Sequence, residues 1–261
     1  MTLNLLDKTT LQLLNRKYLR YSLTAAEKDY FLALALKVLS QSPLASVFVF
    51  KGGTALHHCY LPQSRFSEDL DFTSLDKTLT AEAVTAIFAP YPFFRVRKFY
   101  TSKSTIKIER LMYSGVLDQP NSLKLDIDVC QNVILPPCRL AYKNIWGVEV
   151  TVNVMDIREI YAEKLRAMSD RARYRDFYDF YLIAQEYHLS LDEAIHLVKQ
   201  KEVRQPISLE SILHNWKTSS QSRQDEIDVV YYKPDIFTNE RVIDEFLKGL
   251  HFETIAANKI G

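Results

Sequence analysis

Two glycines and two aspartates carry the clearest chemical signal in the sequence. Gly52 and Gly53 follow an apolar run at residues 47–50 and a single lysine, Lys51, and Asp69 and Asp71 come soon after, one leucine apart. Glycines after a buried strand let the backbone approach a ligand closely, and the N–H groups that begin a helix favour a phosphate. Two carboxylates on one face of a strand suit Mg²⁺, which takes one or two protein carboxylates plus substrate phosphates. The combination predicts a metal and nucleotide site, although each motif alone is also common in ordinary loops and turns.

A third carboxylate comes from a strand predicted at residues 123–129. Apolar residues alternate there with Lys124, Asp126 and Asp128, so both aspartates share the polar face. Either one is placed to take the proton of an attacking hydroxyl or to share a metal. We favour Asp126.

Lys164 interrupts the apolar stripe of a helix predicted at residues 157–168. A buried ammonium without an anionic partner would cost several kcal/mol, so an anion must meet it. That anion is a substrate phosphate, or else Asp176 or Asp179 in a purely structural pair; alternatively the side chain extends past the core to solvent.

These residues resemble the nucleotidyltransferase superfamily, whose signature is a Gly-Gly or Gly-Ser turn followed by Asp-x-Asp. More narrowly, they resemble the AbiEii/AbiGii toxin family of AbiE-type toxin–antitoxin systems, to which the MenT toxins are related. The matching stretches are FKGGTAL at residues 50–56, RFSEDLDF at 65–72, AEKLRA at 162–167 and RDFYDF at 175–180, where Phe180 replaces the usual leucine.

The resemblance implies a role for each matching position. Catalytic roles fall to five residues, Asp69, Asp71, Asp126, Lys164 and Asp176, the first three of which bind the metal. Nucleotide binding is expected of Lys51, Gly52, Gly53, Thr54, Ser67, Arg175 and Asp179. The cofactor would be Mg²⁺ or Mn²⁺, and the substrate an NTP.

Three further features have both a functional and an ordinary interpretation. Ser67 shares the Asp-x-Asp face, and some relatives with this spacing are silenced when the antitoxin phosphorylates the serine; its hydroxyl could equally bind its own turn. Residues 93–113 interleave aromatic and basic side chains, which suits single-stranded RNA but also an ordinary half-exposed hairpin. Arg171, Arg173 and Arg175 form a basic cluster that binds phosphate or only water.

The elements that must position these residues follow from hydrophobic periodicity. Residues 1–46 are predicted to be a helical lead-in, with a capping box of Thr24 and Glu27 before its second helix. Residues 47–150 are predicted as a small α/β nucleotidyltransferase domain with strands at 47–50, 65–72 and 123–129, a helix at 80–89 and a hairpin at 93–111. Residues 151–261 are predicted as a helical C-terminal domain with a loop at 217–235. The fold class is α+β, with a mixed sheet.

The composition sets limits on the function. The 33 basic and 32 acidic residues leave a net charge of +1, which excludes a polybasic nucleic-acid coat. Three cysteines without zinc-like spacing indicate a reduced, cytoplasmic compartment. The longest apolar stretch, residues 30–39, is too short to span a bilayer, so no membrane partner is expected.

The sequence thus predicts an Mg²⁺-dependent nucleotidyltransferase toxin, of the EC 2.7.7 type. It would transfer NMP from NTP to a hydroxyl of RNA, with a tRNA 3′ end implied by the resemblance, and arrest growth until a cognate antitoxin counters it. Two alternatives remain: transfer to a small molecule such as an antibiotic, or to a protein hydroxyl; and a non-catalytic nucleotide-binding regulator.

Overall fold

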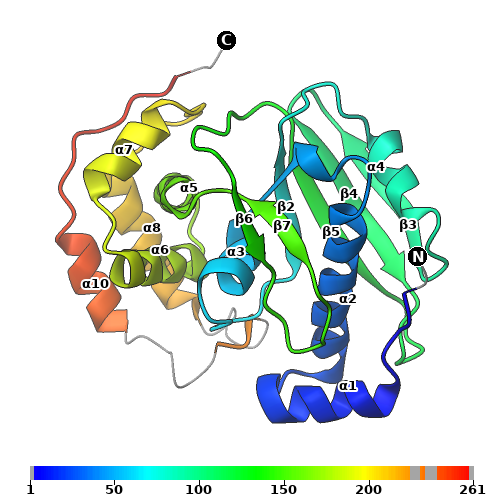
Figure 1. The fold of residues 1–261 in the computed structure, drawn as a ribbon. Helices are drawn as coiled ribbons and strands as arrows, with labels where there is room; N and C mark the ends of the chain where they lie inside the picture. The colour runs from blue at the N-terminus through cyan, green and yellow to red at the C-terminus, as the bar shows by residue number, and fades with distance from the viewer. Residues whose placement is uncertain (1–2, 224–229, 233–239, 259–261) are drawn as a thin grey trace. The chain divides into compact units, whose positions relative to one another are not determined.

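The computed structural model describes residues 3–223, 230–232 and 240–258, and the chain forms two compact units (Figure 1). The first comprises Met1–Val133 and Pro137–Val154, the second Ile134–Pro136 and Met155–Gly261. The domain boundaries predicted at residues 46 and 150 stay predictions. Within the described residues, no helix is both long and apolar enough to cross a membrane.

A seven-stranded mixed sheet forms the centre of the first unit. Its strand order is β3-β4-β5-β2-β1-β7-β6, so β3 and β6 are the edges. The strands are β1 (Phe48–Lys51), β2 (Asp69–Ser74), β3 (Phe94–Thr101), β4 (Thr105–Tyr113), β5 (Asn121–Asp128), β6 (Cys138–Ala141) and β7 (Thr151–Val154). The pairs β1–β7 and β2–β5 are parallel, and the other pairs are antiparallel. The predicted α+β class with a mixed sheet is confirmed.

One face of this sheet is apolar and covered by helices. Leu123, Leu125 and Ile127 of β5 are fully buried on that face, as their alternation predicts. Helices α2 (Leu23–Ser40) and α4 (Ala81–Phe88) contact it, with α2 in front of β5 in Figure 1. The charged residues of β5 therefore lie on the opposite face, which α2 and α4 leave uncovered.

The helical lead-in is confirmed, but its predicted cap is wrong by two residues. A short helix α1 (Lys8–Leu14) continues into a π-helical turn (Asn15–Leu19) before α2. Ser22, not Thr24, is the N-cap of α2, because its side chain accepts a hydrogen bond from the Ala25 amide. The Glu27 carboxylate instead accepts from the Leu117 amide at 2.8 Å, and it is buried.

Two other predictions for the first unit need correction. The strand expected over residues 65–72 begins only at Asp69, so Arg65 and Ser67 lie in the segment that leads into β2. Strands β6 and β7 were not expected, because each has only four residues and too short a pattern to read.

The second unit is helical, as predicted. Its helices are α5 (Ile157–Asp170), α6 (Tyr174–Tyr187), α7 (Leu191–Lys199), α8 (Leu209–Gln221) and α10 (Glu240–Lys248). Asp156 is the N-cap of α5, and its carboxylate accepts a hydrogen bond from the Arg158 amide. The loop expected at 217–235 is wrong for residues 217–221, which belong to α8, and residues 224–229 and 233–235 of it lie outside the described residues.

Candidate functional site

The glycine turn packs directly against the Asp-x-Asp strand. Gly52 has φ of +78°, and a Cβ added to it would lie 2.4 Å from Oδ2 of Asp71. A Cβ on Gly53 would lie 2.5 Å from Nη2 of Arg65 and 2.9 Å from Oγ of Ser67. Gly52 is therefore favoured by its left-handed backbone and by its close contact with Asp71, whereas a side chain at Gly53 would displace the ends of the Arg65 and Ser67 side chains. Sequence reasoning did not single out Arg65, which is 2% exposed.

Thr54 completes this contact between the turn and the strand. Its hydroxyl donates a hydrogen bond to the Asp69 carbonyl oxygen at 2.5 Å and lies 2.9 Å from Oγ of Ser67. Thr54 is fully buried, in the short helix α3 (Gly52–Ala55). The first residues after β1 and the first residues of β2 are thus held in a fixed register, which positions Asp69 and Asp71 beside the glycines.

Four charged residues form a row across four adjacent strands. Lys51 of β1 is opposite Asp71 of β2 in the strand register. Asp71 is in turn opposite Asp126 of β5, and Asp126 is opposite Lys107 of β4. Residues opposite each other on neighbouring strands project from the same face. The row, called here the charged row, therefore reads plus, minus, minus, plus on the polar face of the sheet. Asp69 lies two residues before Asp71 and shares that face.

Lys107 and Thr105 hold the carboxylate of Asp126. The Lys107 ammonium lies 2.9 Å from Oδ2, and the Thr105 hydroxyl donates to Oδ1 at 2.9 Å. The hydrogen bond and charge of Asp126 raise the pKa of Lys107, with smaller contributions from Asp69 and Asp71. Lys107 is thus electrostatically coupled to all three predicted metal ligands, a role that sequence reasoning missed because the strand register was unknown.

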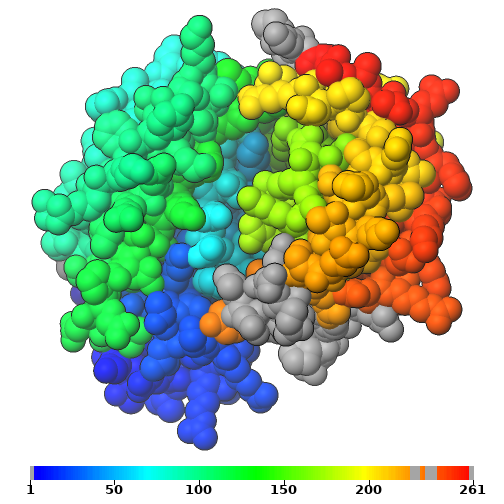
Figure 2. Space-filling model, turned by 180° about the vertical axis from the view of Figure 1, so that it is seen from behind, coloured from blue at the N-terminus to red at the C-terminus, as the bar shows by residue number. Residues whose placement is uncertain are grey.

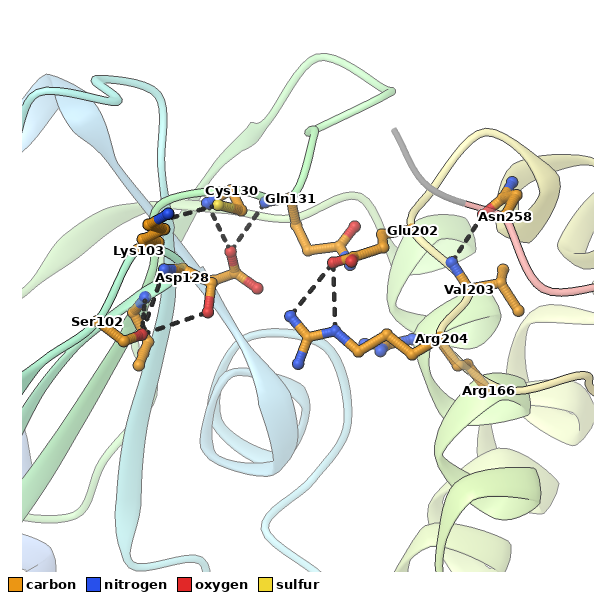
Figure 3. Close-up of polar contacts among 12 residues, drawn as sticks. Ser102, Lys103, Asp128, Cys130, Gln131, Arg166, Glu202, Val203, Arg204 and Asn258 are labelled. Atoms are coloured by element: carbon orange, nitrogen blue, oxygen red, sulfur yellow. Dashed lines mark hydrogen bonds and ion pairs between the residues drawn. The ribbon is translucent and has the colours of Figure 1, made fainter. Parts of the chain in front are cut away.

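Asp128, the alternative third carboxylate, has a structural role. Its Oδ1 accepts hydrogen bonds from the backbone amides of Cys130 and Gln131 at 2.9 and 2.8 Å, as Figure 3 shows. This is an Asx turn that ends β5. The geometry therefore favours Asp126 over Asp128 for a chemical role.

The carboxylates of Asp69 and Asp71 fit an open site for one divalent cation better than a site enclosed entirely by protein ligands. Asp69 and Asp71 offer the oxygen ligands that Mg²⁺ prefers. Within the described part of the chain, no three His, Cys, Asp or Glu side chains gather closely enough to hold a metal. The carboxylate of Asp126 is instead paired with the ammonium of Lys107 at 2.9 Å. The three-aspartate metal site stays a prediction.

In the second unit, Lys164 lies between two buried carboxylates. Its Nζ is 2.8 Å from Oδ1 of Asp176 and 2.7 Å from Oδ2 of Asp179, while Arg171 Nε is 2.8 Å from Oδ2 of Asp176. The side chains of Lys164, Asp176 and Asp179 are 9%, 1% and 0% exposed. Burial alone would raise the pKa of Asp176, but Lys164 and Arg171 outweigh it and hold that pKa below its usual range. The structural pairing left open by the sequence is therefore present.

Helices α5 and α6 create this cluster. Lys164 is on α5, Asp176 and Asp179 are on α6, and Tyr161 stacks on Phe180 with ring centroids 4.2 Å apart. The expected nucleotide contacts of Lys164, Asp179 and the half-buried Arg175 stay predictions.

A second buried ion cluster was missed by sequence reasoning. Lys201 is 1% exposed and lies 2.6 Å from Oε1 of Glu159 and 2.9 Å from Oε1 of Glu163. Glu159 also accepts hydrogen bonds from the Ile134 and Leu135 amides. Because Lys201 and Glu159 lie far apart in the sequence, no local spacing reveals the pair. Residues 202–204 follow Lys201 and are exposed in part. Arg204 forms an ion pair with Glu202, and the Val203 amide donates a hydrogen bond to Oδ1 of Asn258 (Figure 3).

Comparison with known proteins gives the family of this chain. The model of the family described as "Nucleotidyl transferase AbiEii toxin, Type IV TA system" matches residues 34–256, which include every predicted site residue. The chain belongs to the AbiEii nucleotidyltransferase toxin family. A search of curated protein sequences gave no significant match.

Solved structures share the AbiEii fold. The nucleotidyltransferase toxin MenT4 from Mycobacterium tuberculosis H37Rv is similar with a TM-score of 0.58 and 21% identity, over 92% of this chain and 90% of that one. JHP933 from Helicobacter pylori is similar with a TM-score of 0.54 and 20% identity, over 87% of this chain and 95% of that one. A structure described as a putative nucleotidyltransferase from H. pylori is similar with a TM-score of 0.53 and 21% identity, over 89% of this chain and 100% of that one. At these identities the similarity establishes the fold, while substrate and acceptor need their own arguments.

Proposed function

We propose that this AbiEii-family chain is an Mg²⁺-dependent nucleotidyltransferase toxin that transfers NMP from an NTP to a hydroxyl of RNA. The observation that carries the proposal is the packing of the Gly52-Gly53 turn on Asp71, with Asp126 opposite Asp71 on the next strand. In this proposal, a backbone that can approach phosphate lies beside carboxylates with the chemistry to bind a cation, which is what nucleotidyl transfer requires.

In the proposed reaction, the acceptor oxygen bonds to the α-phosphorus and the bond to the β-phosphate bridging oxygen breaks. Pyrophosphate leaves, and the acceptor proton passes to the Asp126 carboxylate. A bound Mg²⁺ would neutralise phosphate charge. Asp69 and Asp71 would hold it, Gly53 and Thr54 would bind phosphates, and Lys107 and Thr105 keep Asp126 in position.

Lys164, Arg175, Asp176 and Asp179 enter the proposal on the family resemblance alone. The same resemblance supports a tRNA 3′ end as acceptor, growth arrest as outcome and a cognate antitoxin as partner, all in the cytoplasm, where NTP and RNA are available. Co-expression with the product of the neighbouring gene should restore growth if that product is the antitoxin.

Incubation with α-phosphate-labelled NTP and Mg²⁺ tests the reaction. Total RNA, lysate protein and candidate antibiotics would be supplied together and then separated, and we expect label in the RNA. Asp69→Asn and Asp71→Asn should abolish labelling while the circular dichroism melting curve stays unchanged. Asp192→Asn, which alters an exposed aspartate of α7, is the matched control.

Each other result has a defined meaning. Label in protein or in a small molecule would establish one of the alternative acceptors. Binding of NTP without transfer to any fraction would favour the non-catalytic regulator. Labelling that survives in both asparagine variants would overturn the assignment of the Asp-x-Asp pair.

A further inference from the structure

An exposed tyrosine continues the charged row onto a fifth strand. Tyr100 of the edge strand β3 is the register partner of Lys107 in β4, which is in turn opposite Asp126 in β5 and hence in line with Asp71 in β2. All four side chains therefore project from the polar face of the sheet. Strands lie about 4.8 Å apart, so Tyr100 is about 14 Å from Asp71, three strand spacings away.

Tyr100 has an unusual exposure for a large aromatic residue. It is 54% exposed, and its neighbour Phe99 is 45% exposed. Scattered exposed apolar side chains are ordinary. Tyr100 differs because it lies beside a lysine and at the end of the row that contains the proposed reaction centre. Figure 2, seen from behind the view of Figure 1, shows the blue-green surface of residues 93–113 at its left side.

The hairpin that carries Tyr100 is strongly basic. Between residues 93 and 113 the sequence has six cationic side chains and one anionic one, although the whole chain has a net charge of only +1. The cationic residues are Arg95, Arg97, Lys98, Lys103, Lys107 and Arg110. The one carboxylate, Glu109, forms an ion pair with Lys98. The local field therefore favours a polyanion.

From this arrangement we infer that Tyr100 and Lys107 form a subsite for the acceptor RNA, upstream of its reacting hydroxyl. The Tyr100 ring stacks on an unpaired base, and the Lys107 ammonium contacts a backbone phosphate. An ammonium has three N–H donors, so its pair with Asp126 leaves capacity for a phosphate oxygen. Exposed rings among cations are what single-stranded nucleic acid binds, whereas an acidic peptide would need only the cations.

The inference rests on the proposed transfer to RNA, but it has a separate test. A fluorescein-labelled, single-stranded 12-nucleotide RNA would be titrated with the full chain by fluorescence anisotropy, without NTP. Loss of one base–ring stack weakens binding by about 5- to 150-fold, so Tyr100→Ala should raise Kd within that range. Tyr100→Phe keeps the ring and should stay within about twofold of wild type.

Two controls separate stacking from other effects. Tyr18→Ala removes a tyrosine of similar exposure, 48%, outside the hairpin and should leave Kd unchanged. Lys107→Gln should lower the slope of log Kd against log salt by about 0.7, the value for one phosphate contact on a single strand. Melting curves should be unchanged for Tyr100→Ala, because its side chain is exposed.

Four outcomes would overturn the subsite. These are no RNA binding by the wild type, an unchanged Kd for Tyr100→Ala, equal competition by poly-glutamate, or a raised KM for NTP with RNA binding intact. If the wild type transfers nucleotide to RNA and Tyr100→Ala leaves the Kd for RNA unchanged, only the subsite is rejected. A Tyr100 effect on RNA binding without any nucleotide transfer would instead reject the proposed function.

Discussion

Gly52 and Asp71 lie so close that a single methyl group on Gly52 would be 2.4 Å from Oδ2 of the aspartate. The contact joins the two motifs that sequence comparison treats separately, the Gly-Gly turn and the Asp-x-Asp strand. The glycine therefore has a second role besides backbone freedom, because it leaves room for a carboxylate on which the proposed reaction depends.

Gly52→Ala should abolish nucleotide transfer by displacing Asp71. Gly147→Ala is the matched control, since Gly147 has φ of +72° against +78° for Gly52, but a Cβ there would meet nothing within 4 Å. Both variants share a left-handed backbone cost of about 1–2 kcal/mol, visible as similar losses in thermal melts. Only Gly52→Ala should lose Mn²⁺ binding in calorimetry. Equal losses of metal binding would show that the contact with Asp71 is unimportant.

Negative charge at residue 67 should inhibit the enzyme. Oγ of Ser67 is 2.9 Å from Oγ1 of Thr54 and 2.9 Å from the position of a Cβ on Gly53. A phosphate on Ser67 would therefore repel the aspartate carboxylates and the phosphates of the nucleotide. We expect Ser67→Asp to lose toxicity and NTP binding, while Ser67→Ala, which removes one hydroxyl and adds no charge, should lose much less of both. Ser67→Asn has the size of aspartate without its charge. Full toxicity of Ser67→Asp would argue against silencing by phosphorylation.

Lys107→Gln should strengthen metal binding in the absence of nucleotide and RNA. The ammonium offsets the negative charge of Asp126 and, more weakly, of Asp69 and Asp71. Because Lys107 is 40% exposed and screened by solvent, the gain in Mn²⁺ affinity should not exceed about fivefold. Lys98→Gln, which disrupts the pair with Glu109 on the same hairpin, should change nothing. An unaltered affinity in both variants would mean that Lys107 does not act on the metal.

Lys164→Ala should destabilise the protein as well as inactivate it. Removal of the ammonium leaves Asp176 and Asp179, at 1% and 0% exposure, with less compensating charge, at a cost of about 3–5 kcal/mol. Lys248→Ala, at an exposed pair with Asp244, should cost little. Urea unfolding measures both. If Lys164→Ala retains wild-type stability but loses transfer, the lysine acts mainly on the substrate.

Acid should weaken the second unit through Asp176. The folded-state pKa of this carboxyl is below its unfolded value, so its stabilising contribution is complete at neutral pH. The contribution is lost as pH falls below the ordinary carboxyl pKa of about 4. Asp176→Asn should be less stable at pH 7 and should show a smaller loss between pH 5 and 2, measured by urea unfolding at each pH. Parallel pH profiles would contradict this assignment.

The parts of the fold that could be predicted are those with a strong local pattern. The apolar run before Gly52 forms β1, and the alternation around Asp126 forms β5, because burial on one or both faces dictates residue type. The N-cap of α2 was misplaced because Ser22 and Thr24 are chemically similar candidates two residues apart.

The parts that could not be predicted depend on long-range register. Lys107 was visible only as one of several basic residues, and its partner Asp126 follows from how β4 aligns with β5. Likewise Tyr100 joins the row only through the alignment of β3 with β4, which contains two irregularities between Val96 and Phe99. Bulges of this kind change which residues face each other, so counting along the sequence does not locate them.

The placement of Ile134–Pro136 in the second unit, through the hydrogen bonds of Glu159, restricts how this protein can be divided. The backbone passes from one unit to the other after Val133, returns at Pro137 and leaves again after Val154. No single cut in the gene therefore separates the two units cleanly. A fragment starting at residue 155 would lack the backbone amides of Ile134 and Leu135, which bind the buried Glu159.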